Sequence, residues 1–382
     1  MRRGVTAATL ALVLLATGCL GGSAGTTTPP PATCAATASP SVALTIAPVD
    51  PPTATQAACL ARTYRNVVGS PGWSNVPGRF LAANPNVLTW QTRVLTYGFN
   101  ACDSCPQPGL DLATVRRDHP EWILHDAAGG EVHPLDHPDW VLFDFGNVYF
   151  QEAWAYAVEA QLSAHGWSGV ELVDVGNQQD WSAQPIDPRT GAPMTDANRQ
   201  LYLAQALEVV RGGLKTNGGF SLVADNGPAT VVDTPQINST DAVTLRAGFA
   251  SRIGPDWQVL FRYFEAAVDA HVGAWVEDGG SMDPGKRVYG LASYLLVSGP
   301  QSSYGIDPAV ALDPLYRVDF GQPLDVAMHQ GDVWTREFTN ASVAVNPGTL
   351  DETVTLAFGG TVTVPAGGAL IVLADHTYTS AR

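Results

Sequence analysis

Acidic residues stand at the ends of several short apolar runs in this sequence. The segment Gly166–Asn177 (GWSGVELVDVGN) contains a β-branched run that ends in Asp174 and then breaks into a Gly/Asn loop. Other apolar runs end in the same manner, at Asp144, Asp225, Asn226, Glu277 and Asp278. Two carboxyl groups on either side of a glycosidic bond supply the general acid and the nucleophile or base that its hydrolysis requires. The positions of these acids therefore point to acid–base chemistry, with Asp174 as the first candidate.

The elements around these acids alternate between strands and helices. Short apolar runs predict strands over 65–69, 94–99, 141–145, 170–175, 220–225 and 272–276. Amphipathic segments predict helices over 75–84, 111–119, 148–165, 196–217, 257–270 and 286–298. No G-x-G-x-x-G or Walker-type loop follows any of these strands, which argues against a nucleotide-binding fold. This α/β alternation predicts a (β/α)8 TIM barrel, in which acids that end different parallel strands meet at one rim.

The last part of the chain has a different pattern. Short alternating strands are predicted over 337–345, 352–358, 360–364 and 369–373, separated by turns rich in Gly, Pro and Asn. This pattern predicts a small antiparallel, sandwich-like β-module after the barrel. We therefore expect four parts: a signal peptide over 1–18, a tether over 19–58, the barrel over 59–330 and the C-terminal module over 331–382.

The N-terminus has the features of a bacterial export signal. Arg2 and Arg3 precede an apolar core, Val5–Leu15, that is too short for a membrane-spanning helix. The residues Ala16-Thr-Gly-Cys19 resemble a lipobox, in which the cysteine becomes the lipid-modified N-terminus. Cleavage by an ordinary signal peptidase is the alternative. The Thr-, Pro- and Ser-rich stretch that follows has the composition of a flexible tether. We expect an extracytoplasmic protein, held at the membrane through Cys19 or secreted.

The charge balance restricts the partners of this chain. Lys+Arg 20 against Asp+Glu 36 gives a formal net charge of −16, and such a surface repels the phosphate backbone of nucleic acids. A neutral carbohydrate is compatible with this charge, and the 10 Trp residues offer faces for stacking on sugar rings. We expect a carbohydrate partner, no nucleic acid and no cofactor, and the sequence leaves the oligomeric state open.

Four cysteines remain once Cys19 is assigned to lipid attachment. An even number in an exported protein favours two disulfides. Three pairings are possible, and we favour Cys34–Cys59 and Cys102–Cys105. The Cys-x-x-Cys spacing of the second pair also occurs in redox centres, but the thioredoxin-like context of such centres is missing here.

Four of the 8 histidines, His119, His125, His133 and His137, lie close together beside several aspartates. Histidine and aspartate are zinc and calcium ligands, but this spacing matches no ligand motif. We interpret the segment as a loop after a helix and expect no metal site.

Several motifs together resemble one family. The segments are Val94–Gly98 (VLTYG), His119–Gly129 (HPEWILHDAAG), Asp144–Asn147 (DFGN) and Gly169–Asp174 (GVELVD), followed in the tail by Arg336–Asn340 (REFTN) and Val345–Pro347. In this order they resemble secreted proteins of hypothetical glycosyl hydrolase family 15. The resemblance extends over about residues 63–375.

The resemblance implies a (β/α)8 barrel whose fourth strand ends in a catalytic acid, here Asp174, and whose later strand ends in a second acid, here Glu277. The sequence departs from the commonest pattern at Ser168, where related barrels have Asp, and its strand-four acid stands one residue further along. Glu171 is therefore an alternative to Asp174, and Asp278 is an alternative to Glu277. An unpaired acid in the middle of a strand is costly, which favours Asp174.

The local surroundings suggest a role for each acid. A proton donor needs an apolar setting, which the Ala-Trp-Val run before Glu277 offers. Asp174, in a polar Gly/Asn loop, is then the nucleophile or base. The residues expected to contact the sugar are Tyr97, Asp144, Asn177, Trp181, Asp225, Asn226 and Asp278. The alternative function is a non-catalytic glycan-binding or envelope-assembly protein on the same scaffold.

Overall fold

The computed structural model describes residues 42–48, 50–73, 75–99, 107–176, 181–225, 234–278, 283–306 and 313–380. All of them belong to one compact unit, Thr33–Arg382. No helix within these ranges is long and apolar enough to cross a membrane. The predicted signal peptide over 1–18 and the proposed lipid-attachment residue Cys19 lie outside the described residues.

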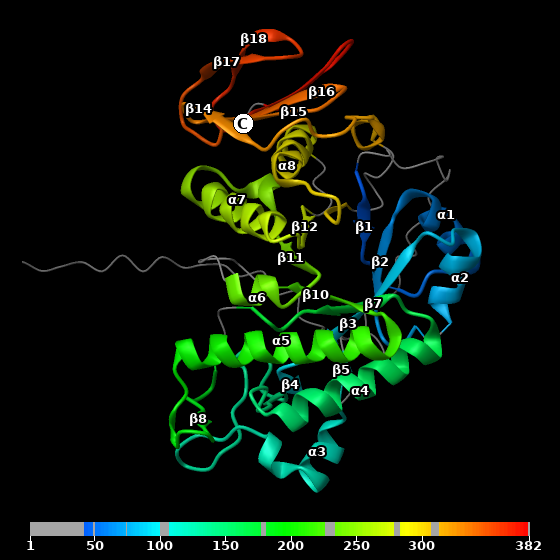
Figure 1. Cartoon of the computed structure of the whole chain (residues 1–382), viewed down its shortest axis with the longest axis vertical. Helices are drawn as coiled ribbons and strands as arrows, with labels where there is room; N and C mark the ends of the chain where they lie inside the picture. Colours follow the sequence, from blue (N-terminus) through cyan, green and yellow to red (C-terminus); the bar gives the residue numbers. More distant parts are fainter. Residues whose placement is uncertain are drawn as a thin grey trace, which may run out of the picture. The chain divides into compact units, whose positions relative to one another are not determined.

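Within the described residues, eight parallel strands form a closed barrel (Figure 1, where all of them but β13 are labelled). Each strand pairs with the next one along the chain, and β1 also pairs with β13, which closes the ring. The strands are β1 (Leu44–Ile46), β2 (Asn66–Gly69), β3 (Leu88–Val94), β7 (Gly169–Leu172), β10 (Ser221–Asp225), β11 (Ala242–Arg246), β12 (Gly273–Glu277) and β13 (Ser303–Gly305). The predicted (β/α)8 barrel is confirmed. A further short strand, β5 (Gln107–Pro108), pairs with β3.

Helices connect the successive barrel strands. They are α1 (Ala54–Thr63), α2 (Val76–Ala83), α3 (Leu112–Asp118), α4 (Val148–His165), α5 (Asp196–Gly218), α6 (Thr234–Asn238), α7 (Gly254–Asp269) and α8 (Pro284–Val297). Short 3₁₀ turns are η1 (Pro120–Trp122), η2 (Phe249–Ser251) and η3 (Pro314–Arg317). The six predicted helices are confirmed with small shifts at their ends, whereas α1 and α6 were not predicted.

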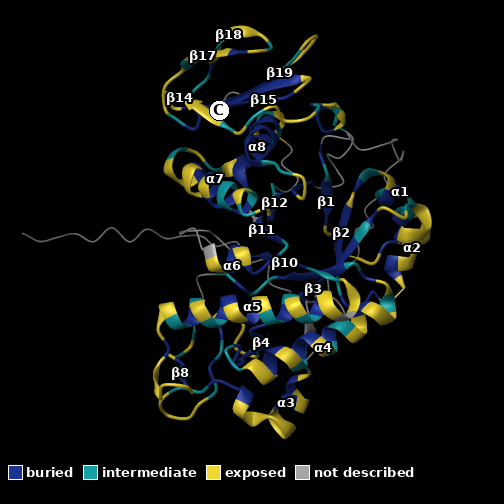
Figure 2. Ribbon diagram, in the orientation of Figure 1, coloured by how far each residue is buried: buried dark blue, intermediate teal, exposed yellow. Residues whose placement is uncertain are grey.

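Helix α4 illustrates why the sequence forms these helices. The Asn147 side chain caps its first turn, and Gly166 ends it in the left-handed conformation with φ 73°. A stripe of buried apolar side chains recurs every four residues: Phe150, Trp154, Val158 and Leu162. The opposite side of the helix is largely exposed, as Figure 2 shows for α4 and α5, which pack against each other.

The inside of the barrel is filled by residues from five strands. They form one buried cluster of Val68, Trp90, Val223, Ala242 and Trp275. The rings of Trp90 and Trp275 meet edge to face with centroids 4.9 Å apart. Side chains alternate between the two faces of a strand, so this cluster marks the inward-facing positions. Asp225, two residues after Val223, and Glu277, two residues after Trp275, therefore belong to the inward face.

Two long connections follow the carboxyl ends of β3 and β7. The first contains β4 (Tyr97–Gly98), α3, η1 and β6 (Val141–Leu142), and β6 pairs antiparallel with β4. The second contains the hairpin of β8 (Ile186–Asp187) and β9 (Ala192–Pro193). An antiparallel bridge between Pro134 and Trp181 joins the two connections. They form a loop assembly beside the ends of the third and fourth barrel strands.

The C-terminal residues form the predicted antiparallel module. One sheet has the order β14 (Met328–Gln330), β15 (Val333–Glu337), β16 (Ala341–Val345), β19 (Ala369–Leu373) and β20 (Thr377–Ser380). A hairpin of β17 (Glu352–Leu356) and β18 (Gly360–Val364) packs on it through a second apolar cluster. The module contacts α8, where Nη1 of Arg336 donates to the carbonyls of Leu295 (2.9 Å) and Ser298 (2.8 Å).

Several predicted strands are wrong in position. Strand β3 ends at Val94, so the strand predicted over 94–99 is displaced, and 141–145 contains only the two-residue β6 outside the barrel. Strands β11 and β13 were not predicted. Strand β1 lies inside the segment predicted as a tether over 19–58, so the barrel begins before residue 59. Strand β1 is a run of only three residues in a Thr/Pro-rich stretch. The average composition of that stretch is typical of a flexible tether, so it does not reveal so short a strand.

Candidate functional site

Three acids reach the carboxyl-terminal rim of the barrel from separate strands. Asp174 lies two residues past the end of β7, and Asp225 and Glu277 are the last residues of β10 and β12. Strands β7 and β10 are neighbours, and β11 separates β10 from β12. In barrels of this type the active site forms at this rim. The predicted convergence of acids on one rim is therefore present in the fold.

Asp174 is held by the backbone that follows β3. The Leu95 N–H donates to its Oδ1 (2.9 Å), and the Thr96 N–H (2.5 Å) and Oγ–H (2.7 Å) donate to its Oδ2. Burial raises the pKa of Asp174, and these hydrogen bonds, which favour the charged form, oppose the rise. The residue as a whole keeps some solvent exposure, but its carboxylate is enclosed by protein. The expected polar-loop setting is therefore wrong for this carboxylate.

Tyr97 and Trp181 lie beside Asp174. The Trp181 indole N–H donates to the Tyr97 hydroxyl (3.0 Å). Burial raises the pKa of Tyr97, the hydrogen bond from Trp181 opposes this, and the nearby charge of Asp174 raises it further. Trp140 stacks on Phe99 with ring centroids 4.3 Å apart and extends the aromatic group. The structure thus brings two of the predicted sugar-contacting residues together with the first candidate acid.

Glu277 occupies the inward face at the end of β12. Its register partner on β13 is Gly305. A Cβ on Gly305 would lie 2.9 Å from Cγ and 3.1 Å from Cα of Glu277, which is closer than ordinary packing allows. The absence of a side chain at Gly305 therefore leaves the space that Glu277 uses.

Glu171 lies deeper in the barrel than the rim acids. It is fully buried, with 0% exposure, and its register partners are Thr92 on β3 and Val223 on β10. Since Val223 faces inward, Glu171 faces inward too, in a core layer below the rim. Asp174 lies past the end of β7, so the alternation of side chains between the two faces of the strand does not determine its direction. Glu171 therefore has no exposed surface at which a substrate could reach it.

Asp278 faces away from the inward acids. Its carboxylate accepts hydrogen bonds from the Ala250 N–H (2.7 Å) in η2 and from the Tyr304 hydroxyl (2.9 Å) on β13. A Cβ on Gly290 of α8 would lie 2.4 Å from its Oδ2. Asp278 thus joins η2 and β13 beneath α8. This position does not fit the predicted contact with sugar, nor the alternative in which Asp278 replaces Glu277.

Asp144 belongs to the loop assembly and carries an ion pair. Arg189, from the β8–β9 hairpin, contacts Asp144 at 2.9 Å and Asp187 at 3.0 Å. Burial raises the pKa of Asp144, and the charge of Arg189 opposes that rise. The guanidinium also lies over the Tyr202 ring, 3.9 Å from its centroid. Asp144 therefore fastens two loops together, which differs from its predicted contact with sugar.

Sequence reasoning missed the residues that position these acids. Thr96 holds Asp174, Arg189 pairs with Asp144, and Arg199 on α5 donates to the Gly176 carbonyl (3.2 Å) just after Asp174. Thr96 stands inside the quoted motif Val94–Gly98, so the motif carried a signal for it. Arg189 stands in a hairpin turn and Arg199 on the predicted helix over 196–217, and neither position carries a sequence signal for its contact.

Several predicted site residues lie outside the described ranges: Asn177, Asn226, Cys19, Cys34, Cys102 and Cys105. Cys59 is described; it is buried on α1 and disulfide-bonded. The pairings Cys34–Cys59 and Cys102–Cys105 stay predictions.

The histidine-rich segment has structural contacts. His119 stacks on Trp122 with ring centroids 3.9 Å apart, and His137 stacks on Trp140 at 4.2 Å. Nδ1 of His133 lies 2.5 Å from the Trp140 carbonyl oxygen. Among the described residues, no group of three or more His, Cys, Asp or Glu side chains could hold a metal ion.

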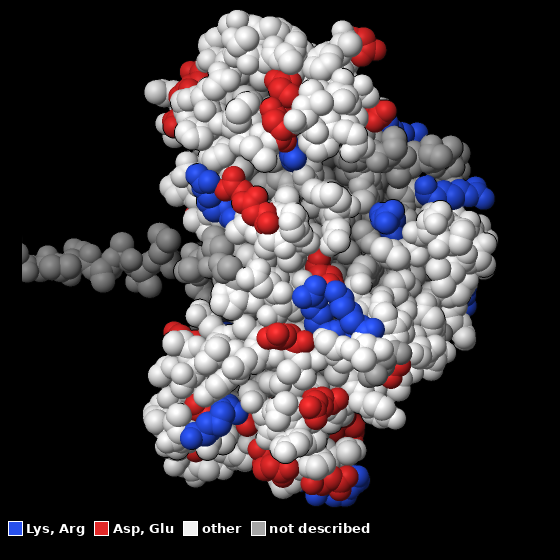
Figure 3. All heavy atoms as spheres, viewed as in Figure 1, with Lys and Arg blue, Asp and Glu red and all other residues white. Residues whose placement is uncertain are grey.

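Acidic and basic side chains are interspersed over the molecular face shown in Figure 3, and the basic ones occur there in small separate groups. The aromatic and acidic groups at the rim are of the kinds that contact and cleave a sugar chain.

Comparisons with known proteins agree with this arrangement. A cycloalternan-degrading enzyme from Trueperella pyogenes, solved with isomaltose, is 10% identical with a TM-score of 0.54, covering 89% of this chain and 60% of that chain. A GH36 α-galactosidase from Geobacillus stearothermophilus is 10% identical with a TM-score of 0.52, covering 87% of this chain and 52% of that chain. At such identities the likeness shows a shared fold. No curated protein matches the sequence. The profile of hypothetical glycosyl hydrolase family 15 matches residues 95–342, more than half of the chain and including Asp174 and Glu277, so the chain belongs to this family and is a glycoside hydrolase.

Proposed function

We propose that this enzyme cleaves O-glycosidic bonds of a polysaccharide or oligosaccharide with Asp174 and Glu277 as its carboxylate pair. One observation carries the proposal: Asp174 is held beside Tyr97 and Trp181 at the same rim to which Glu277 belongs. A flat aromatic surface next to carboxylates suits a sugar ring, whose C–H faces pack on aromatic rings while its glycosidic oxygen receives a proton.

The contacts of each acid support its role. The hydrogen bonds from Leu95 and Thr96 favour the ionised form of Asp174, which a nucleophile or base requires. In this role a carboxylate oxygen of Asp174 attacks the anomeric carbon or takes a proton from the attacking water. Glu277, whose side chain fits against Gly305, is the proton donor to the leaving oxygen.

The test is the release of reducing ends from a panel of bacterial and plant polysaccharides. α-Linked glucans and α-galactosides belong in the panel, because two similar structures are named for cycloalternan degradation and α-galactosidase activity. Wild type is compared with Asp174→Asn, Glu277→Gln and the control Glu152→Gln, which changes an exposed acid on α4.

We expect activity in wild type and the control, and its loss in both active-site variants with unchanged circular dichroism. Activity that survives both substitutions would refute the assignment of the pair. Binding of a glycan by the wild type without any turnover would favour the non-catalytic alternative. The anomer released, read by proton NMR, distinguishes the nucleophile role of Asp174 from the base role.

We further propose that the enzyme is exported and lipid-anchored. The sequence supports this through its signal-like residues 1–18, the lipobox-like cysteine Cys19 and the tether composition that precedes β1. In a bacterial host, the wild type should fractionate with the membrane and Cys19→Ser should not. Wild-type protein found only in the soluble fraction would contradict the anchor.

A further inference from the structure

A cavity of about 610 Å³ lies at the end of the barrel opposite the acidic rim. Its walls include the residues that lead into three barrel strands: 42–44 at β1, 63–65 at β2 and 299–302 at β13. In a parallel barrel all amino ends lie on one side. The cavity is therefore separate from the rim that carries Asp174 and Glu277.

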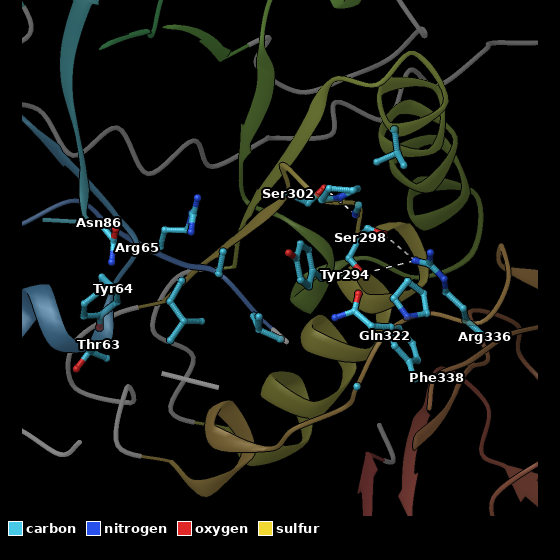
Figure 4. A pocket seen from close by; sticks show the side chains of 18 of the residues that line it. Thr63, Tyr64, Arg65, Asn86, Tyr294, Ser298, Ser302, Gln322, Arg336 and Phe338 are labelled. Atoms are coloured by element: carbon cyan, nitrogen blue, oxygen red, sulfur yellow. Dashed lines mark hydrogen bonds between the residues drawn. The ribbon is translucent and has the colours of Figure 1, made fainter. Parts of the chain in front are cut away.

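The cavity lies between the barrel and the C-terminal module. Figure 4 shows Tyr64, Arg65 and Asn86 on one side of it, and Tyr294 and Gln322 on the other. The second side also includes Phe338 of the module. The barrel and the C-terminal module thus both contribute residues to the walls.

The charged residues of the lining are all basic. They are Arg62, Arg65 and Arg336, and the described residues of the lining include no Asp or Glu. This is the reverse of the whole chain, in which acids outnumber bases by 36 to 20. Among the described residues, no carboxylate forms an ion pair with Arg62 or Arg65. Both are exposed side chains at the edge of the cavity that can receive an anion.

Arg336 contributes a fixed cation to the wall. It is 8% exposed, and its guanidinium donates to the main-chain carbonyls of Leu295, Ser298 and Asp325. Burial lowers the pKa of Arg336, since desolvation disfavours its charge. The nearby charge of Asp325 opposes this fall in pKa and balances part of the positive charge of Arg336, so the exposed Arg62 and Arg65 are the cations that favour a negative group in the cavity.

The neutral lining groups suit a sugar. Amide side chains come from Asn84, Asn86 and Gln322, and hydroxyl groups from Thr63, Ser298 and Ser302. Amides, hydroxyls and guanidinium groups hydrogen-bond to the hydroxyls of a sugar. The volume lies within the range of roughly 300–1,000 Å³ that is typical of small-molecule sites.

We propose that this cavity is a second, non-catalytic site that binds a short saccharide bearing a carboxylate or a phosphate group. A guanidinium pairs with either anion through parallel hydrogen bonds, while the amides and hydroxyls contact the sugar. The proposal is independent of which acids carry out catalysis, because the cavity shares no residue with the rim.

The test is isothermal titration calorimetry at low ionic strength with the full chain carrying Asp174→Asn and Glu277→Gln, which removes turnover. The probes are digalacturonate, glucose 1-phosphate, maltose and inorganic phosphate. Arg62→Gln and Arg65→Gln are introduced separately into this background. Arg117→Gln, at an exposed arginine on α3, is the matched control.

We expect at least one of the two anionic sugars to bind, with at least about tenfold weaker binding in each cavity variant and no change in the control. The anionic sugar that binds more tightly shows whether the site recognises a carboxylate or a phosphate, and added salt weakens its binding. The melting temperature of each variant should match that of its parent, because both arginines are exposed.

Four outcomes would overturn the proposal. Maltose that binds as tightly as the anionic sugars would refute charge recognition. If inorganic phosphate binds as tightly as glucose 1-phosphate and digalacturonate does not bind, the site does not recognise the saccharide. Absence of binding by both anionic sugars, or binding that ignores the Arg62 and Arg65 substitutions, would show that the cavity is not the site.

Discussion

The substitution Thr96→Val tests how the loop after β3 controls Asp174. Valine has nearly the shape of threonine but lacks the hydroxyl that donates to Oδ2 of Asp174 at 2.7 Å. Thr96 is 1% exposed, so water cannot easily replace the lost donor. The backbone N–H bonds from Leu95 and Thr96 remain. The change therefore removes one hydrogen bond to the carboxylate and little else.

The expected effect follows from the strength of that bond. A hydrogen bond to a charged group contributes about 1.5–3 kcal/mol, and one pKa unit corresponds to about 1.4 kcal/mol. Burial already raises the pKa of Asp174, and removing a donor that favours the ionised form raises it by about 1–2 further units. The proposed role needs the ionised form, so the acidic limb of the kcat/KM profile should move to higher pH by that amount.

Stability gives a second measurement that does not depend on activity. The substitution raises the pKa of Asp174 in the folded state and leaves its pKa in the unfolded state unchanged. The variant is therefore less stable than the wild type, and this difference is fully present at pH values above the folded-state and unfolded-state pKa values. The loss should shrink as the pH falls to the ordinary range of a carboxyl group, where Asp174 is protonated in the folded and the unfolded states. Denaturant unfolding at several pH values measures this difference.

Thr89→Val is the matched control for this test. Thr89 is on β3 and, like Thr96, buried, but its hydroxyl has no hydrogen-bond partner among the described residues. This variant should keep the wild-type pH profile. If Thr96→Val leaves the acidic limb in place, Asp174 is not the group that must be ionised. If the alkaline limb moves instead, Asp174 is the proton donor and the two roles are exchanged.

Three other substitutions probe contacts that the structure defines. Gly305→Ala places a Cβ 2.9 Å from Cγ of Glu277; we expect kcat to fall at least about tenfold with the fold retained, and an unchanged kcat would show that Glu277 needs no such space. Arg189→Leu leaves Asp144, whose side chain is 4% exposed, without its cation. Unfolding in urea should show a loss of about 3 kcal/mol that becomes smaller at acidic pH, and a constant loss at all pH values would contradict the ion-pair explanation. Arg336→Met removes the donors to the end of α8; we expect the free energy of unfolding to fall by about 2 kcal/mol and proteases to cleave first between α8 and the module, whereas unchanged protease resistance would refute the role of this contact.

The helices were predictable because their signals are local. The cap and buried stripe of α4 lie within the helix and its two flanking residues. The barrel strands were harder, since a strand buried on both faces shows no alternation. Strands β1 and β13 have only three residues each. Their identity depends on pairing with each other across most of the chain, which no local pattern records.

The place of Asp174 at a strand end was predictable, but the state of its carboxylate was not. The apolar run before Asp174 shows where β7 ends. The hydrogen bonds that enclose the carboxylate come from Leu95 and Thr96, 79 and 78 residues earlier in the sequence. The polar appearance of the following Gly/Asn loop therefore gave the wrong environment.

Acids at strand ends look alike in a sequence and differ in what binds them. Asp144 is paired with the cation Arg189, and Asp278 accepts bonds that join η2 to β13. A carboxylate paired with a cation has its charge largely balanced, so it contributes little to a developing positive charge on a sugar. Asp174 is instead held by neutral donors in an enclosed setting, where a negative charge interacts more strongly than in water. Among these three acids, Asp174 is therefore the one held at the rim beside Tyr97 and Trp181, where its charge can act on an oxocarbenium-like transition state.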